Sequence, residues 1–264
     1  MKHCTVQTVA EAVNRLAPRR LAEEWDNPGL LLGDPIAEVK KIFVCLDVLD
    51  ESISRAIEVD AQLIVAHHPM IFRAIKNVRL DLPHGNKIAR LLKNNLSVFA
   101  AHTNLDSAIG GVNDVLAEKI GLVDVKMFGD EEISLGRIGT LETPMTALDF
   151  ARHVKHALNA ETVRLVDAGD FLVRKVGLCG GSGAEFIGKA KFFGAQAFVT
   201  GDVKYHDAQA AVESRIHVVD AGHFATEFPI VHVLAEYLRG ELKDYPVEIF
   251  EDTAAKDFFT TIQN

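Results

Sequence analysis

The feature of this 264-residue sequence that most restricts its fold is a pattern of apolar strands and amphipathic helices that occurs twice. Each half contains three apolar runs with the length and composition of buried strands. These runs are residues 41–46, 62–66 and 96–101 in the first half, and 174–179, 197–200 and 216–220 in the second. Helical segments separate the runs. Buried strands alternating with helices predict an α/β fold in which helices cover a largely parallel sheet.

The two halves can be aligned at a nearly constant offset. Cys45 and Cys179 lie 134 positions apart (179 − 45). The same offset joins further identical pairs: Gln62 and Gln196, Ile53 and Ile187, and Val65 and Val199. Later in each half, a His-x-x-x-acid segment occurs at residues 102–106 and again at 223–227. Chance similarity between two α/β units is the alternative, but the shared order of motifs favours an internal duplication.

We therefore expect an internally duplicated, two-lobe α/β fold with mixed sheets and a metal cleft between the lobes. The first lobe is predicted to span residues 1–125 and the second residues 126–264, with some interleaving of the two allowed. A strand at 135–141 and an amphipathic helix at 146–159 mark the start of the second lobe. Open α/β sheets bind ligands beyond the carboxyl ends of their strands, so polar residues at those ends are the first candidates for a site.

Composition excludes several classes of protein. The 37 acidic and 28 basic residues give a formal charge of −9, which makes nucleic acid an unlikely partner. Cys4, Cys45 and Cys179 are too few and too scattered for a disulfide framework or a CxxC zinc site, and we interpret them as packing residues. Apolar runs of strand length are far short of the ~20 residues that span a bilayer. With no apolar signal segment at the start, we expect a cytoplasmic protein without membrane contacts.

Four strand ends carry unusual polar groups. They are residues 66–69 (Ala-His-His-Pro), 102–106 (His-Thr-Asn-Leu-Asp), 200–207 (Thr-Gly-Asp-Val-Lys-Tyr-His-Asp) and 221–227 (Ala-Gly-His-Phe-Ala-Thr-Glu). Histidine and carboxylate side chains are ligands for divalent transition metals. A single histidine at a strand end is more often a hydrogen-bonded structural residue. The coincidence of a His-His pair with two His-x-x-x-acid segments favours metal binding instead.

The expected metal ligands are His67, His68, Asp106, His223 and Glu227. Adjacent histidines on an extended strand point in different directions, so using both requires two metals or a bend at the following proline. His223 and Glu227, four residues apart, share one face if they lie in one helical turn. A carboxylate can bridge two ions about 3.5–4 Å apart. The set therefore predicts a dinuclear centre.

Other residues near these motifs have more than one interpretation. His102 is a ligand, a supporting partner or a cap, and the supporting role is favoured. Asp202 and His206 are expected to line the same cleft, although Asp202 fits a helix cap equally well. Trp25, the single tryptophan, is interpreted as a buried aromatic beside a turn rather than a loop residue over the cleft. The amides of residues 180–183 (Gly-Gly-Ser-Gly) could cradle an anion, which is a weak signal without a fuller motif.

Five motifs in order resemble the Nif-three-like family of dinuclear-metal hexameric proteins, the GTP cyclohydrolase I type 2 homologs. They are residues 24–30 (Glu-Trp-Asp-Asn-Pro-Gly-Leu) and the four strand-end segments described above, so the resemblance covers almost the whole chain. It implies a duplicated α/β fold, two metal ions held by the five residues already named, and a toroidal homohexamer. Some relatives carry an extra inserted domain between the halves, for which this chain has no room.

The leading hypothesis is a metal-dependent hydrolase that acts on a small anionic or nucleotide-like substrate. Two cations acidify a bound water, and His206 or His102 acts as general acid and base. The GTP cyclohydrolase chemistry is implied by the resemblance only. The alternative is a non-catalytic metal-binding or adaptor protein that forms a hexameric ring. Mixed imidazole and carboxylate ligands suit two ions of Zn, Fe, Mn or Co per subunit and do not select among them.

Overall fold

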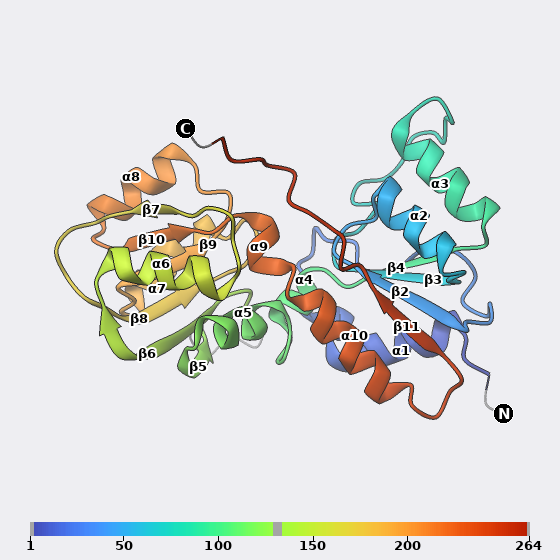
Figure 1. Cartoon of the computed structure of the whole chain (residues 1–264), viewed down its shortest axis with the longest axis horizontal. Coiled ribbons are helices and arrows are strands. Elements are labelled where there is room, and N and C mark those ends of the chain that lie inside the picture. Colours follow the sequence, from blue (N-terminus) through green and yellow to red (C-terminus); the bar gives the residue numbers. More distant parts are fainter. Residues whose placement is uncertain (1–2, 129–133, 263–264) are drawn as a thin grey trace. The chain divides into compact units, whose positions relative to one another are not determined.

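The structure is a computed structural model that describes residues 3–128 and 134–262, and the chain divides into two compact units (Figure 1). Unit 1 comprises Met1–Ala108 and Ile230–Ala255. Unit 2 comprises Ile109–Pro229 and Lys256–Asn264. The chain thus leaves unit 1, builds most of unit 2 and then returns.

Unit 1 is built on a five-stranded sheet with the order β1-β4-β3-β2-β11. Its strands are β1 (Gly29–Leu32), β2 (Lys41–Cys45), β3 (Leu63–Ala66), β4 (Ser97–Ala100) and β11 (Glu248–Glu251). Its helices are α1 (Val6–Leu16), η1 (Arg19–Leu21), α2 (Asp50–Glu58), α3 (Pro83–Lys93), α4 (Thr103–Ser107) and α10 (Ile230–Glu241). All neighbours in the sheet are parallel except β1, which is antiparallel to β4. The carboxyl ends of β2, β3 and β4 therefore meet at one edge.

The sheet of unit 1 is buried on both faces, because alternate strand residues point to opposite sides. Phe43 and Cys45 belong to the cluster that also holds Ile53 of α2 and Leu91 of α3. The alternate residues of β2 are equally buried and face α10, which contacts that strand. Helix α1 begins with Thr5 as a capping residue, packs on α10 and completes this layer. Unit 1 is therefore a helix–sheet–helix sandwich (Figure 1).

Unit 2 contains a six-stranded sheet with the order β5-β6-β8-β9-β10-β7. Its strands are β5 (Val123–Met127), β6 (Arg137–Met145), β7 (Arg164–Val166), β8 (Val173–Leu178), β9 (Ala197–Thr200) and β10 (His217–Asp220). Its helices are α5 (Val112–Ile120), α6 (Ala147–Ala157), η2 (Ala184–Phe186), α7 (Ile187–Phe192), α8 (Tyr205–Glu213) and α9 (His223–Glu227). Only β8, β9 and β10 run parallel. The other neighbours are antiparallel.

Two apolar clusters cover the two faces of this second sheet. One joins Val176 and Val199 to Leu116 of α5 and Phe150 of α6. The other joins Phe198 and neighbouring strand residues to α7 and α8. Unit 2 is thus a second helix–sheet–helix sandwich.

The predicted duplication is confirmed by the topology. Each unit has three consecutive parallel strands, β2-β3-β4 and β8-β9-β10, and the third carries an antiparallel edge strand. The aligned glutamines make the same contacts. Gln62 Oε1 accepts hydrogen bonds from the backbone amides of residues 40 and 41, and Gln196 Oε1 accepts them from those of 174 and 175. Such repeated side-chain-to-backbone bonding is specific to the aligned register.

The division between units differs from the expected boundary at residue 125. Helix α5 and strand β5 belong to unit 2, because α5 packs on β6 and β8 and β5 pairs with β6. Strand β11 belongs to unit 1, because it pairs with β2 from Glu248↔Lys41 to Glu251↔Val44. The two units therefore interleave along the chain, as the sequence allowed, and each contains two separate stretches of it. Among the described residues, no helix combines the length and the apolar character needed to cross a membrane.

Candidate metal centre

His67 and His68 leave the carboxyl end of β3 side by side. Their backbone amides donate to Cys45 O (3.2 Å) and Leu46 O (2.9 Å), so the parallel pairing with β2 continues past the strand. The His67 side chain is 1% exposed and that of His68 is 23% exposed. Their ring centroids lie 4.9 Å apart. Both imidazoles therefore reach the same region, although the residues are adjacent in sequence.

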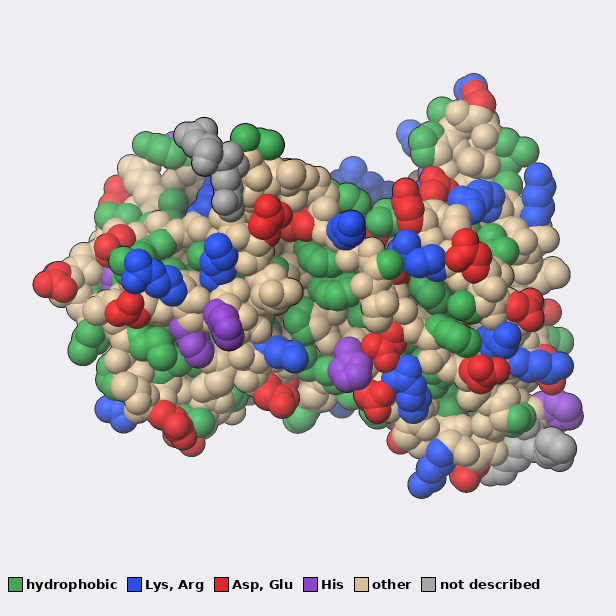
Figure 2. Space-filling view, in the orientation of Figure 1, with side chains coloured by type: hydrophobic (Ala, Val, Ile, Leu, Met, Phe, Trp, Pro, Cys, Tyr) green, Lys and Arg blue, Asp and Glu red, His purple; other side chains and the backbone are tan. Residues whose placement is uncertain are grey.

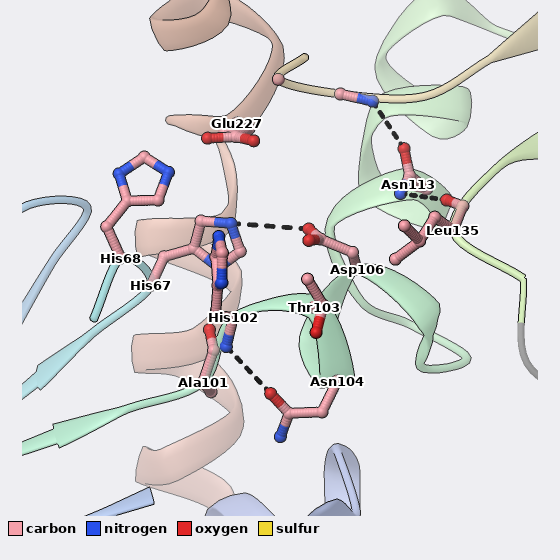
Figure 3. Close-up of polar contacts among 12 residues, drawn as sticks. His67, His68, Ala101, His102, Thr103, Asn104, Asp106, Asn113, Leu135 and Glu227 are labelled. Carbon is pink, nitrogen blue, oxygen red and sulfur yellow. Dashed lines mark hydrogen bonds and ion pairs between the residues drawn. The ribbon is translucent and has the colours of Figure 1, made fainter. Parts of the chain in front are cut away.

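The next parallel strand supplies His102 and Asp106. His102 precedes the short helix α4, and its amide donates to Asn104 Oδ1 (2.9 Å), while Asp106 lies one helical turn further on (Figure 3). Asp106 Oδ1 lies 3.5 Å from His67 Nε2. The His102 ring centroid is 5.3 Å from that of His67 and 5.7 Å from that of His68. Two neighbouring strand ends thus bring three imidazoles and a carboxylate together.

Each of these three imidazoles is oriented by an oxygen at Nδ1. The bonds run from His67 to the Ala101 carbonyl (2.8 Å), from His68 to Asp47 Oδ1 (2.8 Å) and from His102 to Asp26 Oδ1 (2.8 Å). A neutral histidine that donates from Nδ1 has its lone pair on Nε2. Histidines that bind metals show this arrangement, in which an oxygen at the second ring nitrogen fixes the tautomer and the ring orientation.

The donor set of unit 1 fits a divalent transition metal. One ligand atom from each of His67, His68 and His102 lies within 4.8 Å of the others, which is close enough for one ion to contact all three. Nitrogen ligands of this kind bind Zn, Cu, Fe and Ni, and a nearby carboxylate such as Asp106 adds a harder oxygen donor. His102, expected mainly as a supporting residue, is therefore placed by the geometry in a donor group itself.

Asp26 is the least accessible of the orienting carboxylates. Its side chain is fully buried and accepts hydrogen bonds from His102 Nδ1, Thr103 N (3.0 Å) and Thr103 Oγ1. Burial raises the pKa of Asp26, but the bonds from His102 and Thr103 outweigh it and lower the pKa to about 2. Asp26 is therefore a carboxylate at neutral pH and favours an Nδ1–H on His102.

Unit 2 carries a matching pair on α9. His223 Nε2 lies 3.0 Å from Glu227 Oε2, as expected for residues four apart in one helical turn. His223 Nδ1 donates to Asp202 Oδ2 at 2.7 Å, so this imidazole is oriented in the same way as those of unit 1. Glu227 is 5% exposed. The role of Asp202 is thus to hold His223, and its position is equivalent to His68 in the repeat.

Glycines make room for this pair. A Cβ on Gly181, whose φ is +61°, would collide with the Glu227 carboxylate, and one on Gly201 would lie 2.6 Å from His223 N. The amides of Gly180, Gly181 and Gly183 already donate to side-chain oxygens of the same unit. The hypothesis that residues 180–183 cradle an anion is therefore wrong, and the glycines serve close packing instead.

The remaining candidates are not members of the donor groups found among the described residues. His206 is exposed on α8, where Nδ1 lies 3.4 Å from Gln209 Oε1 and the ring contacts Tyr205. The three cysteines are buried, as expected of packing residues. Trp25 is 59% exposed, so its interpretation as a buried aromatic is wrong. The hydrogen bonds of Asp26 to His102 and Thr103 fix the turn after Trp25, and the indole lies on the surface.

Sequence reasoning missed Asp26 and Asp47 as partners of the histidines. The partnership of Asp47 with His68 could have been predicted from the strand register. Cys45 pairs with Ala66 in parallel strands, and counting two residues onward along each strand gives Asp47 opposite His68. Asp26 lies in a loop 76 residues from His102, and no local spacing rule connects the two. Its bond depends on the path of the chain from η1 to β1.

A further group on unit 1 is already occupied by a cation. Ligand atoms of His232, Glu236 and Glu251 lie within 4.8 Å of one another. However, Arg239 Nη1 binds both carboxylates, at 2.7 Å for Glu251. The guanidinium neutralises these acids, so this surface group is an ion-pair network rather than a metal site.

Fold and side chains together define a class: duplicated α/β proteins with oriented histidines and carboxylates at their strand ends. The family model DUF34/NIF3 (NGG1p interacting factor 3) matches residues 4–257, and the chain belongs to this family. It is 35% identical to a "GTP cyclohydrolase 1 type 2 homolog" of Clostridium perfringens, over 96% of this chain and 98% of that protein.

Solved structures agree with this assignment. A Bacillus cereus protein related to NIF3 superposes with a TM-score of 0.93 at 26% identity, covering 99% of this chain and 100% of the other. Reduced HcgD from Methanocaldococcus jannaschii superposes with a TM-score of 0.81 at 28% identity, covering 95% and 98%. The chain therefore has the fold of these proteins over nearly its whole length.

Proposed function

We propose that this chain is a dinuclear divalent-metal-binding protein and a metal-dependent hydrolase. His67, His68 and Asp106 of unit 1 and His223 and Glu227 of unit 2 are the proposed ligands of two ions. His102 is proposed to lie beside this centre as a proton carrier and not as a ligand. The two carboxylates are the candidates for a bridging position, because only a carboxylate among these side chains has two ligand oxygens.

The orientation of the imidazoles is the observation that carries this proposal. Four histidines from two units, His67, His68, His102 and His223, each donate Nδ1–H to an oxygen at 2.7–2.8 Å. Histidines that only hydrogen-bond to surface water would have no reason to present the same ring nitrogen, Nδ1, to a protein oxygen in all four cases. The pattern places the lone pair of each ring on Nε2, the atom that would bind a metal at His67, His68 and His223 and accept a proton at His102.

The proposed chemistry is hydrolysis. When bound, divalent ions lower the pKa of a water ligand from 15.7 to about 7, which makes a nucleophile available at neutral pH. His102 is the better supported of the two expected proton carriers, because it lies beside His67 and His68 and Asp26 fixes its tautomer. His206 is supported by its sequence position alone.

Metal content tests the dinuclear centre. Elemental analysis is expected to give about two divalent ions per chain, and Asp106→Ala and Glu227→Ala are each expected to lose metal. Glu58→Ala, an exposed acid on α2, is the matched control and should keep both ions. One ion or none, with no change in the two variants, would contradict the proposal.

The proposed substrate is nucleotide-like, following the names of the curated relatives. Formate release from GTP by protein loaded with Zn, Mn or Fe is the direct assay. Full metal occupancy without turnover of GTP or any nucleotide in a panel would leave the alternative, a non-catalytic metal-binding or adaptor protein. The proposed homohexamer is tested separately by light scattering of the purified chain.

A further inference from the structure

Two large aromatic side chains lie exposed beside the imidazoles of unit 1. Trp25 is 59% exposed and Phe72 is 43% exposed. Their ring centroids lie 5.9 Å apart in an edge-on arrangement at 66°. We refer to Trp25 and Phe72 as the aromatic corner.

The aromatic corner is held by a network of polar contacts. Asn27 Nδ2 donates to Ile71 O at 2.6 Å, which links the loop after Trp25 to the loop before Phe72. The intervening Asp26 is anchored to His102 and Thr103. Both rings are therefore fixed in place while their outer surfaces remain accessible, which is the arrangement of a preorganised binding surface.

The aromatic corner also contacts the donor group directly. The centroid of His102 lies 6.3 Å from that of Trp25 and 6.2 Å from that of Phe72, both in edge-on geometry. His68 follows at 5.7 Å from His102. A small molecule whose reacting atom sits at the donor group would have the rest of its body within reach of these two rings.

We propose that Trp25 and Phe72 bind the flat heteroaromatic ring of the substrate and position it beside the imidazoles. This inference rests on the proposed hydrolase function and assigns it a ring-bearing substrate. Indole and phenyl rings stack on or pack edge-on against such rings, and this recognition tolerates different bases because every base has a π-face.

The surrounding segment suits an anionic ligand. Figure 2 shows hydrophobic side chains on the projecting segment between β3 and α3, with basic side chains and an acidic one among them. Arg73 and Lys76 follow Phe72 and are both exposed. A nucleoside monophosphate is therefore a suitable probe, and ribose 5-phosphate is its counterpart without the ring.

The single tryptophan allows a direct test in the intact, metal-loaded protein. Guanosine 5′-monophosphate is expected to quench Trp25 fluorescence saturably and to bind at least tenfold more tightly than ribose 5-phosphate in calorimetry. Phe72→Ala should weaken binding of the nucleotide about tenfold, since stacking on one aromatic side chain is worth roughly that factor or more. Trp25→Leu should do the same by calorimetry.

Ile75→Ala is the matched control, because Ile75 lies on the same segment and is also 43% exposed. It should bind the nucleotide like the unaltered chain. Equal binding of the two probes, no binding of either, or equal effects of Phe72→Ala and Ile75→Ala would overturn the proposal. A change in subunit number in Trp25→Leu or Phe72→Ala would also overturn it, because the corner would then be an interface between copies.

Metal content measured on the same samples separates this inference from the proposed function. Two ions per chain without selective ring binding would refute the aromatic corner and leave the dinuclear centre standing. Ring binding that depends on Phe72 in a chain that holds no metal would refute the metal centre and retain the ring site.

Discussion

Replacing Asp47 by alanine tests whether oriented imidazoles determine metal affinity. His68 Nδ1 donates to Asp47 Oδ1 at 2.8 Å, and the Asp47 side chain is 26% exposed. Without this acceptor, the His68 ring can rotate and change tautomer, so Nε2 is presented to the metal for only part of the time. We expect weaker metal binding with an intact fold.

The magnitude follows from burial. Losing such a partner typically costs 10–100-fold in metal affinity, or about 1.4–2.7 kcal/mol. Water can enter beside the partly exposed Asp47 and replace some of the bond, so Asp47→Ala is expected near the lower limit, about tenfold. Asp202 makes an equivalent 2.7 Å bond to His223 but is 44% exposed. Asp202→Ala should therefore cost less, on the order of threefold.

Competition with a chromophoric zinc chelator measures these affinities. His68→Ala sets the full loss of the ligand, and Glu58→Ala is the control for removal of an acid. Thermal unfolding without metal checks that each variant folds. Unchanged affinity in Asp47→Ala, while His68→Ala weakens binding, would refute the reasoning, as would a larger loss for Asp202→Ala than for Asp47→Ala.

Three further predictions concern packing, pH and thiol chemistry. Gly181→Ala should displace the Glu227 carboxylate and destabilise unit 2 by about 1 kcal/mol or more, measured by urea unfolding, because Gly181 has φ +61° and its Cβ would collide with that carboxylate. Burial raises the pKa of Glu251, but the interactions with Arg239 and His232 together outweigh this effect and lower it. The stabilisation from Glu251 should therefore be present above the ordinary glutamate pKa and be lost as pH falls through the lowered value, so Glu251→Gln should destabilise the protein at pH 7 and not at pH 2. Burial raises the pKa of the Cys45 thiol well above its ordinary value, so a thiol reagent at neutral pH should label Cys45 only after unfolding.

Each of these has an internal control. Gly188→Ala, on α7 with open space at its Cβ, should be neutral or stabilising, and equal destabilisation in both glycine variants would contradict the steric argument. Glu248→Gln, on the same strand as Glu251 but exposed, should show no pH-dependent difference. Labelling of Cys45 in the native protein, at a rate independent of denaturant, would contradict its burial.

Much of the candidate site could be predicted from sequence because its signals are local. His67 and His68 follow an apolar run of strand length, and such a run ends where the first polar residues appear. The spacing of His223 and Glu227 equals one helical turn, and the structure shows the 3.0 Å contact that this spacing implies. The offset of 134 residues likewise predicted the duplicated topology, because strands of equal register repeat their contacts, as Gln62 and Gln196 do.

The partners of the histidines could not be predicted in the same way. Asp26 lies 76 residues before His102, and the strand register that brings Asp47 to His68 depends on pairing between β2 and β3. The extent to which the two units interleave could not be predicted for a similar reason. The sequence of strand β11 carries no pattern that predicts a strand. It nevertheless pairs with β2, about two hundred residues earlier in the chain, and so extends the sheet of unit 1 at that edge.

The sequence alone determined the three repeated strands of each unit, the helices between them and the ligand types at the strand ends, since these follow from the period of apolar residues and from spacing within one turn. Tertiary structure alone decided which oxygen orients each imidazole and that Trp25 lies on the surface, because both depend on segments that only folding brings together. Hydrogen bonds of this kind join residues with no fixed separation in sequence. Their geometry is set by how the strands pair and how the loops are anchored.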